Sequence, residues 1–150
     1  MTVTGESIQQ FVSGKTVALV GASGAGKKFG SYAYSELKKR GYVVLPIHPT
    51  AEAIQGDRCW RSLADLPEPV ERLLVVVKPE RSEAVLREAA RAGVRRVWLQ
   101  QGAESPGALL AADELGLDVV HGQCILMFTE PLGFHGIHKW IWKLIGKIPR

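Results

Sequence analysis

The segment at residues 21–28, GASGAGKK, holds residue types that could bind a phosphate group. Its glycines, Gly21, Gly24 and Gly26, put no side chain in the way, so backbone N–H groups and the start of a following helix can approach an anion closely. Ser23, Lys27 and Lys28 add a hydroxyl group and two positive charges. The segment predicts a phosphate-binding turn. The alternative is a tight turn that needs glycine only for its positive φ angles.

Two nucleotide-binding motifs fit this segment incompletely. A P-loop needs serine or threonine where Lys28 stands, because that hydroxyl group binds Mg²⁺, and no aspartate ends a later predicted strand. A dinucleotide-binding turn needs glycine where Ser23 stands, and an acidic residue near His48 for the ribose hydroxyl groups. The residues therefore exclude a nucleotide hydrolase and disfavour NAD. Coenzyme A (CoA) is rich in phosphate and needs no Mg²⁺, and its phosphates could use Lys27, Lys28 and Lys78.

The elements that must position these residues are short apolar strands that alternate with amphipathic helices. Strands are predicted at residues 16–20, 42–47, 73–77, 94–99 and 117–120. Helices are predicted from the glycine-rich turn to Arg40, through Val85 to a stop at Gly93, and from Ser105 to Gly116. This alternation predicts an α/β fold, a doubly wound Rossmann-like parallel sheet of about five strands.

Sheets of this kind bind ligands at the carboxyl ends of their strands. The segments that follow the predicted strands are residues 21–28, 48–50, 78–80, 100–102 and 121–124. Most of the polar residues that could contact a ligand should therefore gather at one edge of the sheet.

The composition is typical of one soluble domain. The chain has 150 residues and a mean hydropathy of +0.03. Its N-terminus lacks the pattern of a signal peptide, and no run approaches the roughly 18 apolar residues of a membrane span, so we expect a cytoplasmic protein. Cys59 and Cys124 lack CxxC spacing, which predicts reduced thiols. Acidic and basic residues balance outside the last twenty residues, which disfavours nucleic-acid binding.

The last twenty residues form a separate predicted element. Their apolar residues recur at helical spacing, at Phe134, Ile137, Ile141, Leu144 and Ile148, with Trp140 and Trp142 at the borders of that stripe. Their charged residues, Lys139, Lys143, Lys147 and Arg150, are all basic. We expect residues 131–150 to form an amphipathic C-terminal helix that packs on the domain of residues 1–130 or joins a homodimer. The alternative is a peripheral helix on an anionic membrane surface.

Several motifs occur together in a familiar order: VALVGAS, GYVVLPIHP, SLADLPEPVERLLVVVKPE, AGVRRVWLQQGA and GLDVVHGQC. In this order the chain resembles, over about residues 15–124, the family of small CoA-binding domains related to the N-terminal domain of the succinyl-CoA synthetase α subunit. The resemblance implies a Rossmann-like domain with CoA lying across the strand ends. Two positions depart from the family pattern, because His48 replaces a usual asparagine and Lys78 replaces a usual proline.

The resemblance also implies where each part of CoA would lie. Gly21, Ala22 and Ser23 would lie at the diphosphate, with Lys28 and Gly30 beside it. Pro46, Ile47, His48 and Pro49 would line the nucleotide. Val77, Lys78 and Pro79 would flank the adenine or pantetheine path, and Gln100, Gln101 and Gly102 would border the end of the thiol arm.

The remaining polar residues allow alternatives. Cys124 could be a nucleophile or form a mixed disulfide with CoA, but a packed side chain is the simpler interpretation. His121, Cys124, His135 and His138 could form a metal set by spacing alone, and we predict no metal. His48 could contact a ribose or phosphate, or hold its own loop.

No paired carboxylates and no assured pair of nucleophile and base follow the predicted strands. We therefore expect non-catalytic binding or sensing of CoA or an acyl-CoA. The alternative function is a small NAD(P)-dependent oxidoreductase or a component of a CoA-dependent transferase.

Overall fold

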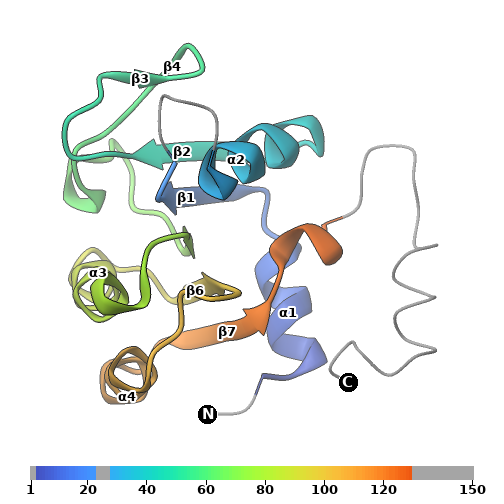
Figure 1. Ribbon diagram of the computed structural model, residues 1–150, viewed down its shortest axis with the longest axis vertical. Coiled ribbons are helices and arrows are strands. Elements are labelled where there is room, and N and C mark those ends of the chain that lie inside the picture. The colour runs from blue at the N-terminus through green and yellow to red at the C-terminus, as the bar shows by residue number, and fades with distance from the viewer. Residues whose placement is uncertain (1–2, 23–27, 130–150) are drawn as a thin grey trace.

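The core of the protein is a parallel sheet of five strands, in the order β2-β1-β5-β6-β7 (Figure 1). The structure is a computed structural model and describes residues 3–22 and 28–129. The strands are β1 (Thr16–Val20), β2 (Val43–Ile47), β5 (Arg72–Val75), β6 (Arg96–Gln100) and β7 (Asp118–Gln123). Chain order reverses direction between β1 and β5, as in a doubly wound fold. The predicted Rossmann-like α/β fold is confirmed.

Helices cover both faces of this sheet. In Figure 1, α1 (Gly5–Val12) and α2 (Phe29–Lys39) lie on one side of the strands, and α3 (Pro79–Arg91) and α4 (Pro106–Leu115) lie on the other. Side chains alternate between the two faces along each strand, so the sheet contributes residues to two separate hydrophobic cores. Leu19, Leu74 and Trp98 belong to the core under α1 and α2, whereas Leu73 and Leu99 belong to the core under α3 and α4.

The ends of the helices follow from their local sequence. The Ser105 hydroxyl group accepts a hydrogen bond from the Ala108 N–H group, Pro106 occupies the first turn of α4, and Gly116 ends the helix in the left-handed conformation. Pro79 likewise occupies the first turn of α3, directly after Lys78. The strand-to-helix transitions therefore fall where the sequence predicted them, within about two residues.

A helix, a hairpin and a 3-10 turn were not predicted. Helix α1 precedes the sheet, and Thr4 caps it by accepting a hydrogen bond from the Ser7 N–H group. A small antiparallel hairpin follows β2 and pairs β3 (Ala53–Ile54) with β4 (Asp57–Arg58). Its turn places both Gln55 and Gly56 at positive φ angles. A 3-10 turn, η1 (Leu63–Asp65), then leads towards β5.

Strand β7 also corrects a prediction. It continues to Gln123, so His121 lies inside the strand and not after it. The last strand pair shifts register between Trp98 and Gln100, and Gln100 pairs with Gln123. This irregularity extends the ladder beyond the apolar run on which the prediction rested.

The described chain ends on the face that carries α1 and α2. A 3-10 turn, η2 (Ile125–Met127), follows β7 there. The guanidinium group of Arg40, directly after α2, donates to the Leu126 carbonyl oxygen at 3.1 Å and to the Thr129 hydroxyl oxygen at 2.9 Å. The predicted helix in residues 131–150 lies outside the described residues. No helix in residues 3–22 and 28–129 is long and apolar enough to cross a membrane.

Candidate functional site

A hollow of about 940 Å³ opens at the carboxyl edge of the sheet, where the strand ends meet. Its wall contains these predicted binding residues: Gly21, Ala22, Lys28, Gly30, Ile47, His48, Pro49, Val77, Lys78, Pro79, Gln100, Gln101 and Gly102. Pro46, which was also expected to line the nucleotide, lies within β2 and is not part of the wall. The predicted residues Ser23 and Lys27 lie outside the described residues. Segments that are far apart in the chain, from Val20 to Cys124, therefore share one concave surface.

Two glycines allow close backbone approaches at the end of β1, where Gly21 meets the segment after β5 and Gly30 of α2 meets Gly21. Gly21 has a φ angle of +120°, and a Cβ atom there would lie 1.9 Å from the Val76 carbonyl oxygen. A Cβ atom on Gly30 would lie 2.2 Å from the Gly21 carbonyl oxygen. Both atoms met are backbone, which cannot move aside as a side chain does. The floor of the hollow therefore requires glycine at both positions.

The charged side chains on the described wall are all cations. Lys28 and Lys78 are the residues that precede α2 and α3, and Arg81 lies in the first turn of α3. All three are exposed, and none forms an ion pair with an acidic residue in the described parts of the chain. Two helix N-termini reach the same wall and add partial positive charge. The hollow is therefore suited to an anion with several charges.

Polar but uncharged groups line the part of the hollow that follows β6 and β7. Gln100 is only 6% exposed, and its side-chain oxygen accepts a hydrogen bond from the Ile125 N–H group at 3.1 Å. Gln101 and Gly102 follow it on the surface, and Cys124 lies half-buried on the same wall. His121 lies within β7 and is not among the residues that line the hollow.

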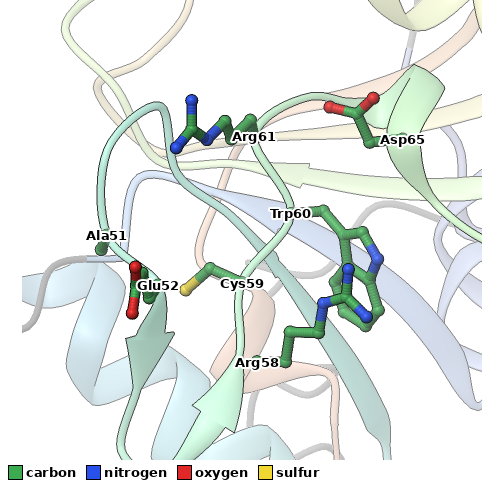
Figure 2. Close-up of a pocket in the computed structure, with 7 residues that line it drawn as sticks. All are labelled: Ala51, Glu52, Arg58, Cys59, Trp60, Arg61 and Asp65. Atoms are coloured by element: carbon green, nitrogen blue, oxygen red, sulfur yellow. The ribbon is translucent and has the colours of Figure 1, made fainter.

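A second, smaller hollow of about 530 Å³ lies beside the hairpin of β3 and β4 (Figure 2). Arg58 lies over the Trp60 ring, with 5.4 Å between the guanidinium carbon and the ring centroid. Burial raises the pKa of the Cys59 thiol there. Acidic and basic residues are equal in number on this wall, which contains Glu52, Asp65, Arg58 and Arg61. This second hollow lacks the excess positive charge of the first.

The comparisons with known proteins agree with this geometry. A family model described as a CoA binding domain matches residues 15–130. The chain belongs to the CoA binding domain family. The solved structure of a conserved hypothetical protein from Pyrococcus furiosus is similar to this CoA binding domain, with 35% sequence identity and a TM-score of 0.72. That match covers 75% of this chain and 97% of the other.

Two curated relatives are much longer than this CoA binding domain. It is 30% identical over 83 residues to the ADP-forming acetate–CoA ligase II of Archaeoglobus fulgidus. It is 29% identical over 91 residues to the α subunit of the ADP-forming acetate–CoA ligase II of Pyrococcus furiosus. The matches cover 54% and 60% of this chain but only 12% and 20% of those relatives. The chain thus spans a fifth or less of their length.

Some residues of the wall were not predicted as binding residues. They are Val20, Phe29, Val76, Arg81, Ala103 and Cys124. Phe29 is 38% exposed, and its ring lies 6.2 Å from that of Tyr32, so this CoA binding domain has an exposed aromatic pair near the hollow. Arg81 could have been found from Pro79, because proline marks the first turn of a helix whose start faces the ligand side.

The metal set considered for this CoA binding domain is not assembled in the described residues. Within residues 3–22 and 28–129, no group of three or more His, Cys, Asp or Glu side chains could hold a metal ion. His135 and His138 lie outside those ranges.

Proposed function

We propose that the chain binds CoA or an acyl-CoA in the large hollow at the carboxyl edge of the sheet. The observation that carries this proposal is a wall whose described charged residues are three cations, Lys28, Lys78 and Arg81, without an acidic residue among them. CoA carries a diphosphate and a ribose phosphate, and charge-assisted hydrogen bonds to phosphate are among the stronger contacts in proteins. Membership of the CoA binding domain family supports the same ligand.

The hollow suits CoA in size as well as charge. Its volume of about 940 Å³ lies at the upper end of what small-molecule sites span, which is roughly 300–1,000 Å³. The resemblance implies that the diphosphate lies at the end of β1, at Gly21 and Ala22, which belong to the wall of the hollow. The same orientation directs the thiol arm towards Gln100, Gln101 and Gly102. We propose this orientation for the bound molecule.

We further propose that the role is binding or sensing without catalysis. The described residues that line the hollow include no carboxylate, and the one described histidine on the wall, His48, uses a ring nitrogen within its own loop. The activity of the acetate–CoA ligases belongs to proteins several times longer than this chain. A partner chain that completes such an enzyme is the alternative to a binding role.

Calorimetry with CoA, acetyl-CoA, NAD and ATP tests the proposal, each titrated with and without Mg²⁺. We expect CoA or acetyl-CoA to bind more tightly than NAD and ATP, with no requirement for Mg²⁺, because the turn lacks the hydroxyl group that binds the metal and β2 ends without an acid for the ribose. Equal or tighter binding of NAD would contradict the proposal.

A matched pair of variants locates the site. Lys28→Ala should weaken CoA binding by about 1.5–3 kcal/mol, the cost of losing a hydrogen bond to a charged group. Lys39→Ala removes a lysine at the other end of α2, where it pairs with Glu36, and should bind CoA like the unmodified protein. Equal affinities of the two variants would show that Lys28 does not contact the ligand.

A further inference from the structure

His48 lies at the end of β2 with one ring nitrogen turned to its own loop. Its Nδ1 atom accepts hydrogen bonds from the backbone N–H groups of Thr50, at 3.1 Å, and Ala51, at 2.9 Å. A ring nitrogen that accepts two hydrogen bonds carries no proton, so a neutral ring must carry its proton on Nε2. The loop therefore selects one tautomer of the histidine.

Trp60, which follows the hairpin in the chain, holds the backbone that carries this ring. The His48 N–H group donates to the Trp60 carbonyl oxygen at 2.8 Å, and the Trp60 N–H group donates to the Pro46 carbonyl oxygen at 3.0 Å. The backbone before His48 is thus held by hydrogen bonds to Trp60, and the backbone after it is held by the hydrogen bonds to the His48 ring. Because the ring is already constrained in the free protein, it loses little further conformational entropy when it binds a ligand.

The other ring nitrogen remains for a ligand. His48 is half-buried on the wall of the hollow, and no hydrogen bond to its Nε2 atom occurs within the described ranges. The charged residues on that wall in the described part of the chain are Lys28, Lys78 and Arg81. A ligand drawn there by three cations brings anionic oxygens, which accept from an N–H donor.

We propose that His48 is a ligand-binding residue that donates a hydrogen bond from Nε2–H, as a neutral ring, to a phosphate oxygen of CoA. The proposal rests on the proposed binding of CoA. In this proposal the hydrogen bonds from Thr50 and Ala51 keep the proton on Nε2, because a proton on Nδ1 would face two N–H donors and destabilise the turn. CoA offers such oxygens in its diphosphate and in its ribose phosphate. The chemistry of the contact is the same for both.

The variant His48→Asn separates the two roles of the ring. An asparagine side-chain oxygen can accept from the same two backbone N–H groups, as in common Asx turns, but the shorter side chain has nothing at the position of Nε2. We expect this variant to melt at the temperature of the unmodified protein and to bind CoA about tenfold more weakly or worse. His121→Asn, a histidine in β7 away from the wall, is the matched control and should bind CoA normally.

Titrating CoA and 3′-dephospho-CoA in parallel identifies the oxygen. A loss in His48→Asn for CoA alone assigns the contact to the ribose phosphate, whereas an equal loss for both ligands assigns it to the diphosphate. Unchanged affinity for both ligands would overturn the proposal. Failure of the unmodified protein to bind CoA would instead overturn the proposed function.

Nitrogen NMR of the histidine rings gives a readout that a purely structural role would not move. We expect His48 to show an unprotonated Nδ1 and a protonated Nε2 in the free protein, and the Nε2 signal to shift when CoA is added. A proton on Nδ1 in the free protein, or a doubly protonated ring in the complex, would overturn the neutral donor, whatever the affinities are.

Discussion

Gly30 shows how a single missing side chain shapes the site. The backbone of Gly21 occupies the space that a Cβ atom on Gly30 would need, at 2.2 Å from the carbonyl oxygen and 2.7 Å from the carbonyl carbon. Helix α2 can therefore begin directly over the turn that follows β1. Any larger residue must push the start of the helix away from the turn, and with it Lys28 and Phe29 on the wall of the hollow.

The variant Gly30→Ala should lower both stability and CoA affinity. We expect a loss of about 1–3 kcal/mol in the free energy of unfolding, the usual cost of overpacking a close contact, measured by chemical denaturation. Gly107→Ala is the control, because the Cβ atom there meets the end of the flexible Glu83 side chain at 2.9 Å, and alanine favours the helix. If both variants behaved alike, the close approach would not matter.

At this scale the sequence predicted many of the residues that line the hollow, but not their spatial neighbours. Lys28, His48 and Lys78 could be identified because each directly follows or closely follows a strand end. Arg81 and Phe29 were missed because their presence on the wall depends on the rotation of a helix about its axis. The double hydrogen bond to the His48 ring depends on a loop conformation that no residue pattern specifies.

The hairpin of β3 and β4 is joined to helix α2 by side chains of both elements. The Tyr34 hydroxyl group donates to the Asp57 carboxylate, and the Lys38 ammonium group lies 2.5 Å from the same carboxylate. The Ser35 hydroxyl group donates to the Gln55 side-chain oxygen at 2.7 Å. Through Trp60, which pairs with the end of β2, these contacts also steady the loop that carries His48.

Two buried tyrosines, Tyr34 and Tyr42, make stability depend on pH in the alkaline range. Burial, and then the hydrogen bond to Asp57, raises the pKa of Tyr34, and burial raises the pKa of Tyr42 to about 12. Both tyrosines therefore stabilise the fold fully below their unfolded pKa near 10, and this stabilisation is lost as the pH rises towards the folded values. The free energy of unfolding should fall with a slope of up to about 1.4 kcal/mol per pH unit for each tyrosine.

The variant Tyr34→Phe should therefore show a shallower loss of stability above pH 10 than the unmodified protein, as measured by urea denaturation at several pH values. Tyr32→Phe changes a tyrosine of the same helix that is 55% exposed, and its profile should match the unmodified one. Identical slopes in all three proteins would contradict the assignment to Tyr34.

The strands of the main sheet could be predicted from the sequence, whereas the hairpin and α1 could not. The sheet strands could be predicted because apolar residues run through them and glycine or proline interrupts the chain between them. The hairpin strands have two residues each, too few for an alternation of side chains to be visible. Helix α1 has eight residues, and only its Thr4 cap and the packing of Ile8 and Phe11 identify it.

At the scale of the whole molecule, the excess of basic residues and the site lie in different parts of the chain. The positive net charge of +4 comes from the last twenty residues, whereas the described wall of the hollow is built from residues between Val20 and Cys124. The two parts should therefore be separable by truncation. The prediction that residues 131–150 form an amphipathic helix remains a prediction from the sequence.

Deleting residues 131–150 should leave CoA affinity unchanged and lower the melting temperature or abolish a dimer. Covering five aliphatic or aromatic side chains stabilises a fold by roughly 1.5–3 kcal/mol each before the loss of entropy. Calorimetry, thermal melting and sedimentation measure these effects. The membrane alternative would hold if the full chain cosedimented with anionic vesicles at low salt, and if the truncated protein did not.

The unequal burial of the two cysteines gives this molecule an internal reporter. Cys59 is buried, and burial raises the pKa of its thiol, whereas Cys124 is half-buried on the wall of the large hollow. A maleimide fluorophore should therefore attach first at Cys124, at the end of the hollow proposed for the thiol arm. Prior addition of CoA should slow that labelling, as followed by mass spectrometry, and the dye once attached should respond to ligands. Occupancy could then be read optically from a protein with no engineered residue.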